Sequence, residues 1–167
     1  MSFSSDVKKE ICSVEQFDRE SLKAELYGML LFSRSCSPNK ITFTTESNYA
    51  GNRLIFLLQN LYMPIIEKQS ALRTKSSDSH LYKIIVVDGN DCKRIFEDFG
   101  HTDGQITLRV NRANLSSEEL SQAFLRGVFL CSAQKSFSGF VQDSFRNNRM
   151  YPYSKNGCPQ RQLHCLF

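Results

Sequence analysis

Two stretches, AELYGMLLFS at residues 24–33 and AFLRGVFLCS at residues 123–132, decide the fold, because they read as two copies of one apolar helix. Each copy carries a glycine at its fifth position, Gly28 and Gly127, and the two glycines lie 99 residues apart (127 − 28). A glycine inside a helix costs roughly 0.5–1 kcal/mol relative to alanine, so its repeated use indicates close approach of two backbones. We therefore expect the two helices to pack together through these glycines, as equivalent elements of two half-repeats.

The chain around these helices mixes helical and strand periodicity. The pattern predicts the following elements, in chain order: helix 4–12, helix 18–33, strand 40–46, helix 48–61, strands 65–75 and 81–87, and helix 91–99. Together with the second glycine helix, this order predicts an α+β fold with antiparallel strands, in which one α-β-β-α-β-β-α unit is followed by the start of a second.

Several boundaries are predicted from capping and turn residues. Ser4 or Ser5 is expected to cap the first helix, and Gly100 to end the helix over 91–99. The serine-rich segment 76–79 reads as the loop of a hairpin, and segment 37–39 as a turn before the first strand. Ser116 is expected to cap the second glycine helix, with Glu119 completing a capping box.

The domain organisation follows from this pattern. We expect residues 1–115 to form a first half and residues 116–132 the first helix of an incomplete second half. Residues 133–167 sustain no period and contain Pro152 and Pro159, which predicts neither helix nor strand there. The expectation for this segment is a disordered or frame-shifted tail.

Composition is typical of a soluble globular protein, with 41% hydrophobic and 23% charged residues among 167. No apolar run reaches the ~18–20 residues of a membrane span and no signal peptide opens the chain, so we expect a cytoplasmic protein. The six cysteines form no Cys-x-x-Cys pair, which argues against zinc and a disulfide framework. His80 and His101 lack metal-ligand spacing and are expected to be solvated turn residues; we expect neither a metal nor a cofactor.

The net charge of +4 is unevenly distributed along the chain. Residues 132–167 carry five basic side chains against Asp143, whereas residues 1–131 carry 16 basic and 16 acidic ones. The globular part is therefore neutral, and its overall charge neither favours nor excludes a phosphate-bearing partner.

The glycine helices resemble the signature helices of LAGLIDADG-type homing endonucleases, whose halves pack through a glycine-containing helix pair and lay curved sheets over DNA. The opening MSFSSDVKKE at residues 1–10 is similar to the start of the WhiA family of bacterial regulators. Residues 43–46 with Arg53, and the segment 111–130, resemble the same family. The resemblance covers about residues 1–132.

The resemblance implies a fold and a function. WhiA proteins are transcription regulators implicated in cell division, chromosome segregation and, in some lineages, sporulation, and they join a degenerate endonuclease-like domain to a helix-turn-helix. DNA is the implied partner, with nucleoid association if it is bound. The tail here shows neither second-half strands nor a helix-turn-helix, so we expect a truncated form.

Nuclease activity is not expected from this chain. In the nucleases each signature helix ends in a carboxylate that holds a divalent metal for phosphodiester hydrolysis. The corresponding positions here are Ser33 and Ser132, and a neutral hydroxyl cannot replace an anionic ligand. We therefore expect no catalysis.

A local basic surface is the remaining candidate for a DNA contact. The candidate residues lie on the polar side of the first strand and around the hairpin: Lys40, Thr42, Thr44, Arg73, Lys75 and Lys83. The alternative is an ordinary solvated sheet face. A second hypothesis is a protein-interaction module, in which the glycine face of residues 24–33 lacks its partner and forms a homodimer.

Overall fold

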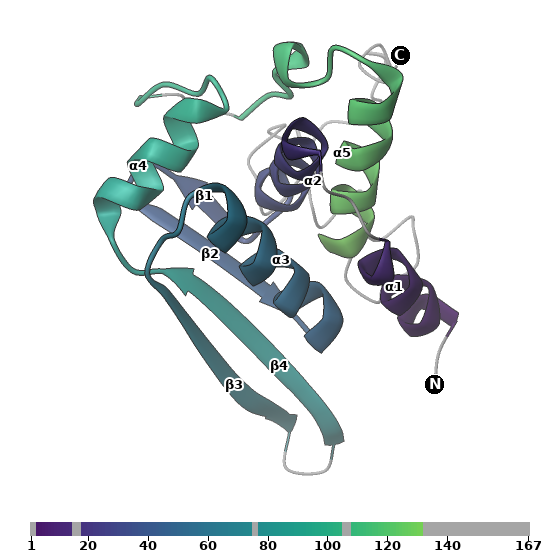
Figure 1. The fold of residues 1–167 in the computed structure, drawn as a ribbon. Coiled ribbons are helices and arrows are strands. Elements are labelled where there is room, and N and C mark those ends of the chain that lie inside the picture. The colour runs from purple at the N-terminus through teal and green to yellow at the C-terminus, as the bar shows by residue number, and fades with distance from the viewer. Residues whose placement is uncertain (1–2, 15–17, 75–76, 105–107, 132–167) are drawn as a thin grey trace, which may run out of the picture.

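The protein is described by a computed structural model that places residues 3–14, 18–74, 77–104 and 108–131; at 3–5, 72–74 and 77–79 only the backbone is described. The α+β class is confirmed (Figure 1). The elements are, in order, α1 (Phe3–Ser13), α2 (Arg19–Leu31), β1 (Ser35–Ser37), β2 (Lys40–Thr45), α3 (Asn48–Leu61), β3 (Ile66–Thr74), β4 (Ser77–Val86), α4 (Gly89–Asp98), the short 3₁₀ helix η1 (Arg112–Asn114) and α5 (Glu118–Cys131).

The four strands form one antiparallel sheet in the order β1-β2-β4-β3. The β3–β4 hairpin extends past the helices in Figure 1. Ile84 and Val86 of β4 are buried and pair with Phe43 and Ile41 of β2, which are also buried. Since successive residues of a strand point to opposite faces, these four side chains define the core face of the sheet.

Helices α2, α3 and α4 all contact the strands from the core face. The opposite face carries alternate residues of the strands and is called the open face below. It consists of Ser35 and Ser37 of β1, Lys40, Thr42 and Thr44 of β2, Leu81, Lys83 and Ile85 of β4, and Glu67, Gln69 and Ala71 of β3. No described helix covers this face.

Helices α2 and α5 lie side by side and cross at their glycines (Figure 1). A Cβ atom on Gly28 would collide with the carbonyl oxygen of Phe124, and one on Gly127 with that of Glu25. Only glycine allows the two backbones this approach. Because α5 of the same chain occupies the glycine face of α2, the expectation that this face lacks a partner is wrong, and homodimer formation stays a prediction.

The predicted elements need a few corrections. The helix over 48–61 and the C-terminal glycine at Gly100, whose φ is 75°, are as predicted. Strand β1 was missed, and segment 77–79 belongs to β4 rather than to a hairpin loop. A serine run has no strand-like side-chain pattern, so the extent of this hairpin is decided by its pairing with β3.

Two predicted helix caps are also wrong. Ser4 and Ser5 lie inside α1, which begins at Phe3. The hydroxyl of Ser117, not that of Ser116, accepts a hydrogen bond from the backbone N–H of Leu120 at 3.3 Å. The cap therefore lies one residue later than the capping-box spacing indicates.

Candidate nucleic-acid interface

The open face brings together four of the six candidate DNA contacts. Thr44 pairs with Lys83 across β2 and β4, and Thr42 pairs with Ile85. Lys40 begins β2, one residue beyond the pair of Ile41 and Val86, and therefore lies at one end of the same face. The pair of Thr42 and Ile85 lies between the two lysines along the sheet. Lys40 and Lys83 therefore present two separate positive charges on the same face.

The two lysines of this face are exposed, and their ammonium groups have no hydrogen-bond or ion-pair partner in the part of the chain that the structure describes. The carboxylate of Glu67, on the β3 side, accepts a hydrogen bond from Nε2 of Gln69 at 2.8 Å. Arg34, also exposed, precedes β1. The open face therefore combines unpaired cations with hydroxyl groups, the side-chain types that contact phosphate oxygens.

Three candidates do not contribute accessible, described side chains. Thr42 is buried, and its hydroxyl has no partner among the described residues. Arg73 lies in β3 where the pairing register shifts, and only its backbone is described. Lys75 lies outside the described residues. Lys40, Thr44 and Lys83 remain as the accessible part of the predicted set.

Ser33 lies two residues beyond the end of α2, where the resemblance implies a nuclease carboxylate. It is buried, and its hydroxyl has no hydrogen-bond partner in the described part of the chain. Ser132 lies outside the described residues. Within residues 3–14, 18–74, 77–104 and 108–131, no group of three or more His, Cys, Asp or Glu side chains is placed to hold a metal ion.

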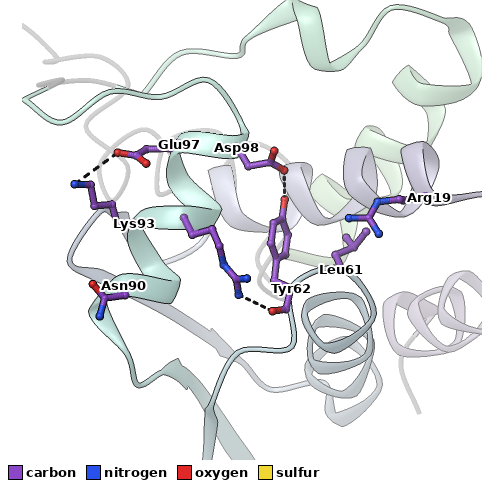
Figure 2. Close-up of a pocket in the computed structure, with 8 residues that line it drawn as sticks. Arg19, Leu61, Tyr62, Asn90, Lys93, Glu97 and Asp98 are labelled. Carbon is purple, nitrogen blue, oxygen red and sulfur yellow. Dashed lines mark hydrogen bonds and ion pairs between the residues drawn. The ribbon is translucent and has the colours of Figure 1, made fainter.

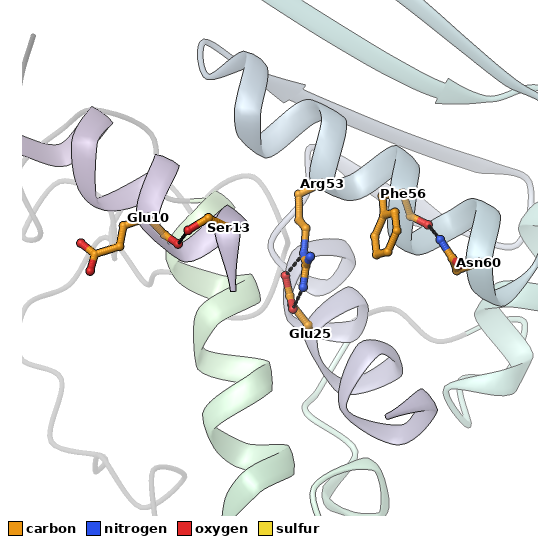
Figure 3. A network of polar contacts seen from close by, with 6 residues as sticks. All are labelled: Glu10, Ser13, Glu25, Arg53, Phe56 and Asn60. Atoms are coloured by element: carbon orange, nitrogen blue, oxygen red, sulfur yellow. Dashed lines mark hydrogen bonds and ion pairs between the residues drawn. The ribbon is translucent and has the colours of Figure 1, made fainter. Parts of the chain in front are cut away.

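A buried ion pair joins α2 and α3 within the helix layer (Figure 3). Arg53 of α3 donates two hydrogen bonds to Glu25 of α2, Nε to Oε1 at 2.8 Å and Nη2 to Oε2 at 2.9 Å. Glu25 is fully buried, and the Arg53 side chain is nearly so. Sequence reasoning did not identify the pair, although a glutamate within the apolar α2 was a signal that a cation lies nearby.

A shallow cleft of about 600 Å³ opens between the start of α2, the end of α3 and α4 (Figure 2). Its charged groups bind one another: Tyr62 donates to Asp98 at 2.5 Å, and Arg94 donates to the Tyr62 carbonyl oxygen at 2.6 Å. Burial, together with this hydrogen bond, raises the pKa of the Tyr62 hydroxyl. These groups are engaged in holding the three helices together, so we assign no ligand to the cleft.

The surroundings of the described cysteines and of His101 indicate that these residues have structural roles. Burial raises the pKa of the Cys12 thiol to about 11 and that of Cys36 to about 12, which leaves both protonated near neutral pH. His101 is buried and lies 3.2 Å from the Tyr27 hydroxyl, so the expectation of a solvated turn residue is wrong for it. His80, which is exposed, lies in β4 rather than in a turn.

Comparison with known proteins identifies relatives for most of the chain. No family model matches it. It is 31% identical over 142 residues to a protein of Clostridium beijerinckii and 29% identical over 139 residues to one of Clostridium botulinum, both named probable cell division protein WhiA. Each comparison covers 78% of this chain and 44% of the relative, so the chain spans less than half the length of these proteins.

A solved structure shows the same fold. The crystal structure of the N-terminal LAGLIDADG domain of DUF199/WhiA superimposes with a TM-score of 0.52, covering 87% of this chain and 75% of that chain at 17% identity. No described helix is long and apolar enough to cross a membrane. The resemblance stated from the sequence is thereby confirmed: the chain is a homologue of WhiA proteins and corresponds to part of such a protein, the part with the LAGLIDADG-like fold.

Proposed function

We propose that this chain binds duplex DNA through the open face, without cleaving it, as part of a WhiA-type regulator of cell division and chromosome segregation. The observation that carries the proposal is the pair of unpartnered lysines, Lys40 and Lys83, on a sheet face that no described helix covers. The names of the relatives support the cell-division role. Ser33, which stands at a carboxylate position of the nucleases, supports binding without catalysis.

The expected binding is electrostatic and sensitive to salt. Each phosphate that a lysine neutralises releases counterions and adds about −0.9 to the slope of log K against log salt. Two lysines therefore account for roughly two units of this slope. Hydroxyl groups such as that of Thr44 position the backbone but carry no sequence information.

Fluorescence anisotropy of a labelled duplex, measured over a range of salt concentrations, tests the proposal. We expect the variant Lys40→Ala/Lys83→Ala to bind more weakly than the parent and with a slope smaller by roughly two units. Lys93→Ala/Arg112→Ala is the matched control, because it removes the same charge from exposed positions that are not on the open face.

Two results would contradict the proposal. One is a parent chain that does not bind the duplex at low salt. The other is an equal loss of affinity in both double variants, which would mean that net charge rather than the open face decides binding. Joint replacement of Arg73, Lys75 and Lys83 should likewise lower the affinity and its salt dependence together. Unchanged binding of this variant would also contradict the proposal, because Lys83 is one of the two lysines that carry it.

A protein-interaction surface is the second candidate, and α5 carries the observation that favours it. Leu125 and Phe129 lie one turn apart on α5 and are 53% and 39% exposed. The residues 99 positions earlier, Leu26 and Leu30 of α2, are fully buried against the core. Sedimentation of the parent and of Leu125→Gln/Phe129→Gln tests this surface: loss of self-association in the variant would support it, and a monomeric parent excludes self-association.

A further inference from the structure

Three apolar side chains are exposed near one end of the sheet, where α3 leads into β3 and where β4 ends. Met63 is 84% exposed, Ile65 is 66% exposed and Val87 is 57% exposed. The backbone N–H of Val87 donates to the carbonyl oxygen of Ile65 at 3.0 Å, so these two residues lie side by side. The three residues are called the apolar corner below.

Met63 adopts a backbone conformation that glycine adopts far more readily than other residues. Its φ is +52°, and it is the only described non-glycine residue with a positive φ. It follows Tyr62, the C-cap of α3, at the position where helices most often have glycine. A methionine there is strained, and its side chain gains little packing at this exposure. The backbone N–H of Met63 donates to the carbonyl oxygen of Leu58 at 3.1 Å, so the backbone conformation serves to end α3 and leaves the side chain exposed.

Charge and area favour DNA as the occupant of the apolar corner. Lys40 and Val87 lie at the same end of the sheet, because β2 and β4 are antiparallel and these residues come next to the pair of Ile41 and Val86. A second copy of the chain facing this surface would bring lysine against lysine, which is unfavourable. Three side chains also fall short of the ~800 Å² that each partner of a stable protein complex buries. The corner is continuous with the surface proposed to bind DNA.

We propose that the apolar corner wedges against a base step at one end of the bound duplex and bends it. This inference rests on the proposed DNA binding. Methionine and isoleucine are among the side chains that partially unstack a base step and kink DNA by 20–90° in architectural proteins. Pyrimidine–purine steps unstack most easily, so they are the preferred site.

The test uses a duplex with a donor and an acceptor fluorophore at its two ends and 2-aminopurine within pyrimidine–purine steps. We expect the parent chain to raise energy transfer and 2-aminopurine fluorescence together. Met63→Gly should lose both signals but keep most of the affinity, since the phosphate contacts remain. Glycine accommodates the positive φ, so this variant should also melt at a higher temperature than the parent.

Controls separate a wedge from other effects. Leu125→Ala, which shortens an exposed apolar side chain on α5, should bend the duplex as the parent does. Ile65→Thr is a second variant of the corner and should reduce the bend in part. Both variants keep the two lysines of the open face.

The possible contrary results differ in what they overturn. A parent that binds the duplex without bending it, or a Met63→Gly variant that bends it fully, overturns the wedge and leaves DNA binding intact. A parent that does not bind the duplex overturns both proposals. If Met63→Gly changes only the sedimentation of the free protein, the corner is a protein contact and the wedge is wrong.

Discussion

At the residue scale, the helix pair depends on the absence of two Cβ atoms. Gly28→Ala or Gly127→Ala would place a methyl group against a backbone carbonyl of the opposite helix, where no flexible side chain can move away. We expect each variant to lower the free energy of unfolding by about 1–3 kcal/mol, the usual cost of overpacking. Urea unfolding measures this.

The control for this prediction is Gly89→Ala, at the start of α4, where an added Cβ meets nothing within 4 Å. Alanine also has the higher helix propensity, so this variant should be neutral or slightly more stable. Equal stabilities for the three alanine variants would contradict the close approach of α2 and α5.

The second prediction at this scale concerns the buried ion pair. Glu25→Leu leaves the guanidinium of Arg53 buried without its carboxylate, which typically costs about 3–5 kcal/mol. Replacing both partners, as in Glu25→Leu/Arg53→Met, should recover much of that loss because no uncompensated charge remains. Chemical denaturation of the parent, of the single variants Glu25→Leu and Arg53→Met and of the double variant gives the coupling; additive effects in the double variant would show that the pair is not coupled.

At the element scale, Asp98 of α4 joins three helices. Its carboxylate accepts from Lys23 of α2 at 2.8 Å and from Tyr62, the C-cap of α3, at 2.5 Å. Burial works against ionisation, but the hydrogen bonds from Lys23 and Tyr62 outweigh it and hold the pKa of Asp98 below its ordinary value. Asp98 thereby links α4 to both α2 and the end of α3.

The sign of the pH dependence follows from this lowered pKa. The unfolded chain binds a proton to Asp98 more readily than the folded one, so the stabilisation is present above about pH 4 and is lost as pH falls through the folded pKa. The stability difference between the parent and Asp98→Asn should therefore shrink on acidification. Urea midpoints at pH 6 and pH 3 measure it, with the exposed Asp103→Asn as control; a constant difference would contradict the account.

Some elements could be predicted from the sequence and others could not, for physical reasons. Helix α3 was predicted from the apolar stripe that repeats along it, and the structure adds Ser47 as its N-cap, so local and global preferences agree. Strand β1 has three residues with no alternation of its own, and it exists because β2 pairs with it. The pairing register of the strands and the cap of α5 at Ser117 likewise depend on contacts that a local sequence pattern does not contain.

At the scale of the whole molecule, the open face follows from where the helices pack. Helices α2, α3 and α4 cover one side of the sheet, and α5 packs on α2 rather than on the strands. Alternation along β2 predicted that Lys40 and Thr44 share a face, and the structure places Lys83 with them. The burial of Thr42, the ion pair of Glu25 with Arg53 and the strain at Met63 needed coordinates, because each depends on residues distant in sequence or on a backbone angle.

The central claim, that the open face contacts DNA, is tested most directly by methyl NMR of the chain bound to a short duplex. Strand β4 supplies its own control, because Ile85 lies on the open face whereas Ile84 and Val86 lie in the core. The account predicts intermolecular contacts between DNA protons and the methyl groups of Ile85, Val87 and Ile65, and none to Ile84 or Val86. Contacts confined to residues of the helix layer, with the Ile85 and Val87 methyl groups unaffected, would contradict it.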